Sequence, residues 1–205
     1  FQREANILAT LSHHAIPKIY DFFDQNERAY LVMEHINGRD LEAILTQTRT
    51  LPIDKVIEWS LDMCGVLHYL HSHQPDPIVF RDIKPSNIMV DSLGKVRLID
   101  FGIAKTFVQA DRKKHTIIGT EGYSAPEQYK GQISPLSDQY SLGATLHHIL
   151  TRKDPRLEHP FTFQERPISE FNPEVPSWFK DVIERALQFA PNDRFESWEE
   201  MFTGY

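Results

Sequence analysis

The chain has 205 residues, 40% of them hydrophobic and 25% charged, which are ordinary values for a globular protein of one or two domains. Its formal net charge of −7 at pH 7 argues against nucleic acid or an anionic membrane as the main partner. Cys64 is the single cysteine, so an internal disulfide is excluded. Without a signal peptide or an apolar run near the roughly 20 residues of a membrane span, we expect a reducing, cytoplasmic location.

The first predicted element is a helix over residues 1–11, where apolar side chains recur at helical spacing. Two predicted strands follow at residues 18–24 and 29–35, joined by a turn at residues 25–27. The chain also begins at Phe1 without an initiator Met, from which we expect it to be a segment of a longer polypeptide.

Two helices come next. Asp40 is a favourable N-cap for a short helix that ends near Gln47. Pro52 is suited to the start of a longer helix over residues 53–73. The apolar positions of this second helix recur at helical spacing and predict one buried face: Val56, Ile57, Leu61, Cys64, Leu67 and Leu70.

The centre of the chain predicts a small hairpin with reactive side chains at both ends. Two apolar, strand-like runs, residues 88–90 and 96–99, are joined by the turn Asp-Ser-Leu-Gly. The segment Arg-Asp-x-Lys-x-x-Asn precedes the first run, and Asp-Phe-Gly follows the second. Carboxylates, a lysine and an asparagine at this spacing suit phosphoryl transfer, in which one carboxylate accepts a hydroxyl proton and oxygen ligands hold metal ions on the phosphates.

The remaining third is predicted to be mostly helical. Residues 103–120 form a polar segment with a basic run, and residues 134–150 form a helix apolar enough to be buried. Proline-rich irregular structure with a short helix is expected at residues 151–176. Two closing helices are predicted at residues 178–189 and 197–202.

Four motifs, in the same order along the chain, resemble those of protein kinases, and they are most similar to those of bacterial, eukaryotic-like Ser/Thr kinases. FRDIKPSN followed by IDFG resembles the catalytic loop and the metal-binding turn. GTEGYSAPE resembles the end of the activation segment, and SDQYSLG the start of the large buried helix. The resemblance covers essentially the whole chain. It implies an α+β fold with a partial N-lobe, helix and two strands, at residues 1–35, and a mostly helical C-lobe at residues 36–205.

The resemblance also implies the catalytic and metal-binding roles. Asp82 would be the base that orients the acceptor hydroxyl, and we expect its carboxylate to face solvent. Lys84 would contact the transferred phosphate; a lysine here resembles Ser/Thr rather than tyrosine kinases. Asn87 and Asp100 would hold Mg²⁺ on ATP. The implied substrate is therefore a protein Ser or Thr hydroxyl, phosphorylated by ATP.

Other positions carry binding and structural roles by the same match. Met33 would lie behind the adenine pocket, with the backbone of Glu34 and Ile36 on its edge and Met89 also in the ATP site. We expect Thr120 to bond the catalytic Asp and Lys. Three structural contacts are also implied: the helix glutamate Glu4 in an ion pair, an ion pair of Glu127 with Arg194, and Asp138 bonded to the catalytic-loop backbone. Phe101 and Gly102 would form the turn after the second strand, and Thr116 would be a phosphosite paired with Arg81. An apolar column would consist of Leu8, Ile19, Phe80 and Phe101.

The chain departs from the family pattern at two places, and these departures leave alternatives to an active protein kinase open. Phe80 stands where the family usually has His, which keeps the position apolar but loses an imidazole hydrogen bond. The Gly-rich phosphate-covering loop and the strand lysine that would pair Glu4 are missing from these residues, so we expect the fragment alone to be inactive. The alternatives are a pseudokinase scaffold that binds a protein partner, which need not keep the catalytic residues, and a small-molecule kinase of similar fold.

Overall fold

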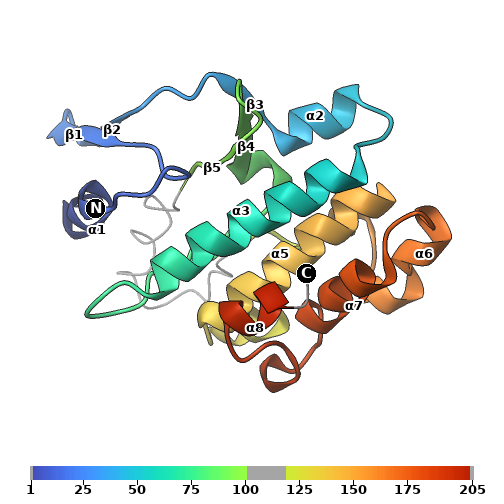
Figure 1. Cartoon of the computed structure of the whole chain (residues 1–205). Helices are drawn as coiled ribbons and strands as arrows, with labels where there is room; N and C mark the ends of the chain where they lie inside the picture. Colours follow the sequence, from blue (N-terminus) through green and yellow to red (C-terminus); the bar gives the residue numbers. More distant parts are fainter. Residues whose placement is uncertain (1, 101–118, 204–205) are drawn as a thin grey trace.

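The computed structural model describes residues 2–100 and 119–203. The roles expected of Phe101, Gly102 and Thr116 fall outside these residues, as does the side chain of Glu4. Figure 1 shows the N-terminal helix and hairpin at one end of the molecule, a small sheet beside them, and a larger group of helices at the other end. The expected α+β class is confirmed.

The N-terminal part is a helix and a hairpin, as predicted. Helix α1 spans Gln2–Thr10, strand β1 spans Ile19–Gln25 and strand β2 spans Arg28–Met33. The strands pair antiparallel. The turn between them has left-handed backbone at Asn26 (φ 52°) and Glu27 (φ 60°). Two successive positive φ values match the twist of the paired strands, which explains the tight connection.

The predicted central hairpin is part of a three-stranded antiparallel sheet. Its strands are β3 at Gly38–Asp40, β4 at Ile88–Asp91 and β5 at Val96–Leu98, in the order β3-β4-β5. Strand β3 was not predicted. A Cβ on Gly38 would lie 2.2 Å from the carbonyl oxygen of Val90, so this edge can approach β4 only where the chain has a glycine.

Helices form the rest of the described chain. Asp40 caps the first of them as predicted, since its Oδ1 accepts from the Ala43 N–H at 2.7 Å. The long helix ends at His71, two residues before the predicted end. The α-helices are α2 at Leu41–Gln47, α3 at Ile53–His71, α5 at Pro135–Thr151, α6 at Ile168–Phe171, α7 at Ser177–Ala186 and α8 at Trp198–Thr203. Short 3₁₀ helices lie at Pro85–Asn87, Pro126–Lys130, Pro155–Leu157, Phe163–Glu165 and Pro191–Asp193.

The core surrounds α5, which lies alongside α3 in Figure 1. All of its residues from Ser137 to Thr151 are buried. A helix that is buried on every side needs apolar neighbours on every side. They come from α3, α6 and α7. The same continuous cluster extends to the strands β4 and β5, and it includes Leu67, Leu70, Ile88, Leu98, Leu142, Leu146, Phe179 and Ile183.

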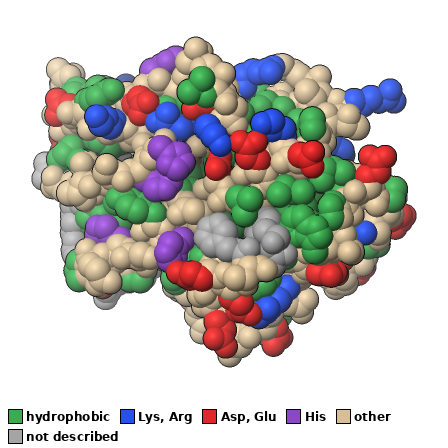
Figure 2. Space-filling model, viewed as in Figure 1, with side chains coloured by type: hydrophobic (Ala, Val, Ile, Leu, Met, Phe, Trp, Pro, Cys, Tyr) green, Lys and Arg blue, Asp and Glu red, His purple; other side chains and the backbone are tan. Residues whose placement is uncertain are grey.

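The surface carries mixed charge. In the face drawn in Figure 2, acidic and basic side chains are interspersed with apolar ones, so the net negative charge is not gathered there into one field. Among residues 2–100 and 119–203, no helix is long and apolar enough to cross a membrane.

Candidate active site

Asp82 lies at the centre of a hydrogen-bonded group in the loop between α3 and β4. Its Oδ1 accepts from the Thr120 hydroxyl at 2.6 Å, and its Oδ2 lies 3.1 Å from the Lys84 ammonium. Lys84 also donates to the Thr120 hydroxyl at 2.7 Å. The predicted contact of Thr120 with both Asp82 and Lys84 is confirmed. The site therefore holds a carboxylate, an ammonium and a hydroxyl within hydrogen-bond distance of each other.

The expectation that Asp82 faces solvent is wrong. The residue is 4% exposed, because Thr120, Lys84 and Asn87 close around its carboxylate. Asn87 adds a bond from its Nδ2 to Oδ2 at 3.1 Å and another to the Asp82 carbonyl at 2.8 Å. Three donors on a buried carboxylate stabilise its charged form and hold its orientation. Asp82 therefore has a structural role as well as a candidate catalytic one.

The backbone before Asp82 is strained and held from both sides. Arg81 has a φ of 74°, which is unfavourable for a residue with a Cβ. Its N–H donates to Asp138 Oδ1 at 2.8 Å, and its carbonyl accepts from the Gln128 amide at 3.2 Å. Asp138 Oδ2 also accepts from the Phe80 N–H at 2.8 Å. The expected contact of Asp138 with the loop backbone is confirmed.

Phe80 fills its position with a buried ring, at 2% exposure. An imidazole from another element is close to this position, since His71 Nε2 at the end of α3 lies 2.8 Å from Asp138 Oδ2. Leu8 is also buried and Ile19 partly so. Their packing into one column with Phe101 stays a prediction, because Phe101 lies outside the described residues.

The two expected metal ligands are brought close by the backbone. Ile99, next to Asp100, donates its N–H to the carbonyl of Asn87 at 3.0 Å. The Asn87 amide nitrogen is used by Asp82, which leaves the amide oxygen for a cation. Asp100 is exposed and has a φ of 61°. An amide oxygen and a carboxylate are the hard donors that Mg²⁺ prefers, so these residues fit that ion.

An ion pair that the sequence did not predict ties the expected adenine edge to the hairpin. Arg97 of β5 donates to Glu34 Oε2 at 2.7 Å, and the Lys18 N–H donates to the same oxygen at 3.1 Å. These donors hold the pKa of the Glu34 carboxyl below its ordinary value. The Glu34 N–H donates to the Lys18 carbonyl at 2.8 Å, so its own carbonyl is the backbone group left for a nucleotide. In the sequence, the one signal for this ion pair was that Arg97 stands between two apolar residues of a short strand, so that its side chain is on the opposite face from theirs.

The other residues expected at the adenine pocket are near this ion pair. Met89 is directly opposite Arg97 in the β4–β5 register and opposite Asp40 in the β3–β4 register. Met33 is the last residue of β2, one residue before Glu34, and Ile36 is buried at 8% exposure. Their contact with adenine stays a prediction.

The expected pair of Glu127 and Arg194 is confirmed as a bidentate ion pair. Arg194 Nη1 and Nη2 donate to the two carboxylate oxygens at 2.7 and 2.9 Å. Burial by itself would raise the pKa of the Glu127 carboxyl, but the bonds and charge of Arg194 outweigh it and lower the pKa. Ser137 also donates to Glu127, at 2.9 Å. The segment after Thr120 is thereby attached to the start of α5.

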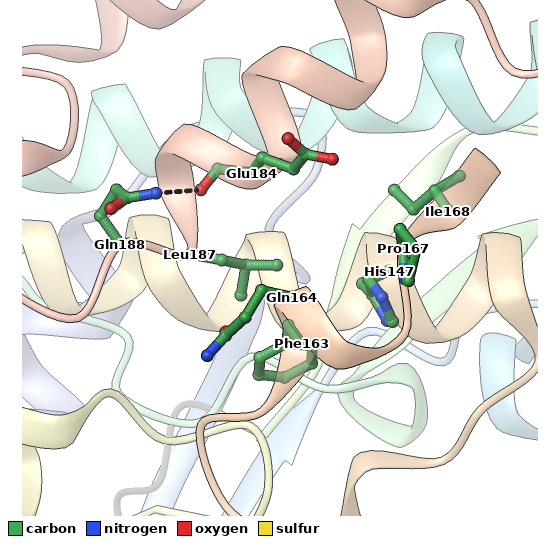
Figure 3. A pocket seen from close by; sticks show the side chains of 8 residues that line it. All are labelled: His147, Phe163, Gln164, Pro167, Ile168, Glu184, Leu187 and Gln188. Carbon is green, nitrogen blue, oxygen red and sulfur yellow. Dashed lines mark hydrogen bonds between the residues drawn. The ribbon is translucent and has the colours of Figure 1, made fainter. Parts of the chain in front are cut away.

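A separate cavity of about 220 Å³ lies among α5, α6 and α7. Figure 3 shows its eight lining side chains, with His147 and Ile168 on one side and Glu184 and Gln188 on the other. Burial lowers the pKa of His147 to about 4, and its ring bonds the Arg166 carbonyl at 2.7 Å. None of the catalytic-loop residues lines this cavity, so it is distinct from the candidate active site.

Comparisons with known proteins agree with this geometry. The family described as Protein kinase domain matches residues 1–203. A probable serine/threonine-protein kinase PknB of Lactococcus lactis is 35% identical over 99% of this chain, and PknA of Nostoc is 36% identical over 98%. The chain spans about a third of the length of these curated relatives, 34% and 37%. The chain is also similar to the solved PknI kinase domain of Mycobacterium tuberculosis, determined as a double mutant, with a TM-score of 0.79 and 27% identity. The match covers 100% of this chain and 75% of that structure. The chain belongs to the protein kinase family.

Proposed function

We propose that this chain carries the catalytic loop and the protein-substrate side of an ATP-dependent kinase that phosphorylates Ser and Thr hydroxyls. The observation that carries the proposal is the contact of Asp82, Lys84 and Thr120, in which one hydroxyl bridges the carboxylate and the ammonium. A base and a cation at this distance are what transfer of a phosphoryl group to a hydroxyl requires. The names of the bacterial relatives support the same substrate class.

Each residue would have one task in this reaction. Asp82 would orient the acceptor hydroxyl and take its proton, and Lys84 would balance the charge that develops on the transferred group. Asn87 and Asp100 would hold Mg²⁺, which when bound neutralises charge on the terminal phosphates. Asp138, through the backbone of Phe80 and Arg81, keeps the loop in the geometry these tasks need.

The acceptor class can be tested directly. We expect a polypeptide that contains this chain and is active to give phosphoserine and phosphothreonine in phosphoamino-acid analysis. Predominant phosphotyrosine would refute the proposed substrate class. Absence of transfer with intact nucleotide binding would favour the alternative, a scaffold that binds a protein partner without catalysis.

The 205 residues contain no Gly-x-Gly-x-x-Gly segment. In this family such a segment covers the phosphates, and a strand lysine contacts them. We therefore propose that the 205-residue chain by itself binds Mg-ATP weakly and has no measurable turnover. Calorimetric titration of Mg-ATP into this chain and into a polypeptide extended upstream by three strands tests this. Micromolar binding with peptide phosphorylation by the short chain would refute it.

A further inference from the structure

Helix α8 is connected to the catalytic loop by a buried series of hydrogen bonds. The indole N–H of Trp198 donates to His71 Nδ1 at 2.6 Å. The other ring nitrogen of His71 bonds Asp138 Oδ2 at 2.8 Å. Asp138 is fully buried and accepts from the backbone of Phe80 and Arg81. The C-terminal helix is thus three hydrogen bonds away from the residue before Asp82.

The direction of each bond in this series follows from the chemistry of the groups. An indole nitrogen only donates, so Nδ1 of His71 must accept and carries no proton. The proton of the ring is then on Nε2, where it donates to the Asp138 carboxylate. In the other tautomer, a ring N–H would face the indole N–H and a lone pair would face the carboxylate. Trp198 therefore selects the one neutral tautomer that suits Asp138.

The surroundings hold Trp198 in place for this role. Its side chain is buried at 4% exposure, and its ring lies 5.5 Å from the His71 ring. The next residue, Glu199, lies 3.3 Å from His68, one turn before His71 in α3. Glu200 of α8 pairs with Arg185 of α7 at 2.6 Å. Figure 1 shows α8 below α3, close to the start of α5. The indole is therefore fixed by its neighbours and by its own burial.

We propose that Trp198 is a positioning residue for phosphoryl transfer, which acts by holding His71 as an Nε2–H donor to Asp138. With that donor in place, the buried Asp138 carboxylate is stabilised and keeps Arg81 in its left-handed conformation. Without it, the bonds to the Phe80 and Arg81 N–H groups weaken and the loop that carries Asp82 loses its support. The effect on catalysis rests on the proposed kinase function, whereas the effect on His71 and the loop does not.

The first experiment uses the 205-residue chain and needs no activity. Trp198→Phe removes the indole N–H and keeps an aromatic ring. Long-range ¹H–¹⁵N correlation of the histidine rings should show the Nε2–H form of His71 in the wild type and a mixture in the variant. Amide hydrogen exchange at Phe80 and Arg81 should become about tenfold faster, as expected for the loss of one hydrogen bond. An unchanged tautomer and unchanged exchange in the variant would overturn the proposal.

Trp59→Phe is the matched control. Trp59 is buried at 8% exposure, and its indole N–H donates to the Gly94 carbonyl at 3.1 Å, away from Asp138. This variant removes the same atoms from a similarly buried side chain. It should leave the His71 tautomer and the exchange of the Phe80 and Arg81 amides as in the wild type. The same changes in both variants would mean general loosening and would overturn the proposed specific role.

The second experiment measures catalysis in a complete, active polypeptide. Trp198→Phe should lower kcat several-fold with little change in KM for Mg-ATP, because the expected adenine edge at Glu34 and Ile36 lies outside the loop that Asp138 holds. His71→Gln, which can donate to Asp138 and accept from the indole, should keep more activity than His71→Leu. Equal kcat in the wild type and Trp198→Phe, or equal loss in both His71 variants, would overturn the role. A wild type that lacks transfer would instead refute the proposed function, and the tautomer and exchange results would still decide whether Trp198 supports the loop.

Discussion

Replacement of Asp82 by Asn tests the candidate active site most directly, because it removes the charge and changes one atom while keeping the shape. Asp82 Oδ1 accepts from Thr120, and Oδ2 accepts from Lys84 and Asn87. An Asn side chain has one acceptor oxygen and one NH₂ group. The NH₂ group fits best toward Thr120, since a hydroxyl can also accept, whereas the Lys84 ammonium only donates.

The magnitude follows from these contacts. The variant loses a short hydrogen bond to a charged acceptor and the negative charge beside Lys84, whose side chain is 20% exposed. Loss of one such bond costs about 1.5–3 kcal/mol. For a chain of this size that lowers Tm by about 3–12 °C. If Asp82 is the base, phosphotransfer by an active polypeptide should fall by about 10²–10⁴.

The assay combines transfer of the γ-phosphate to a Ser- or Thr-containing peptide with thermal unfolding of the same samples. Asp181→Asn on the exposed face of α7 is the control and should change neither measurement. Near-normal transfer in Asp82→Asn would refute the catalytic assignment. An unchanged Tm with lost transfer would refute the argument that the buried carboxylate also stabilises the fold.

Further predictions concern the ion pairs, a buried histidine and the expected phosphosite. Glu127→Ala should lower the free energy of unfolding by about 3–5 kcal/mol, because it leaves Arg194 buried without its carboxylate. The lowered pKa of Glu127 means that its contribution is present above its ordinary value of 4.5 and is lost as the pH falls further, so unfolding of wild type and Glu127→Ala should converge in acid. Arg97→Met should raise KM for Mg-ATP more than it lowers kcat in steady-state kinetics, since it frees the Glu34 segment; an unchanged KM would contradict this. The pKa of His147, lowered to about 4, predicts that unfolding measured between pH 6.5 and 4 shows a stability loss that His147→Gln reduces. Thr116→Ala should lower activity and remove a phosphate seen by mass spectrometry, and full activity with the phosphate retained would contradict the regulatory role.

Much of the local structure could be predicted because it is encoded at short range. Asp40 caps α2 through the N–H of a residue three positions on. The spacing of Asp82 and Asn87 brings them together within one loop and a 3₁₀ turn. The contacts of Glu127 with Arg194 and of Asp138 with the loop were expected only because the motifs resemble a known family. Periodicity alone does not pair residues 67 positions apart, as Glu127 and Arg194 are.

What the sequence determined by itself is thus the order and type of most of the elements, strand β3 excepted, and the identity of the reactive groups, since helical periodicity, caps and turns act between neighbours in the chain. Tertiary structure decided which distant groups meet. Arg97 reaches Glu34 across 63 positions, and Trp198 reaches His71 across 127. It also decided that Asp82 is buried, because Thr120 closes over a carboxylate that a loop by itself would leave in water. These contacts depend on how helices and strands pack, and packing is set by the whole core rather than by any local pattern.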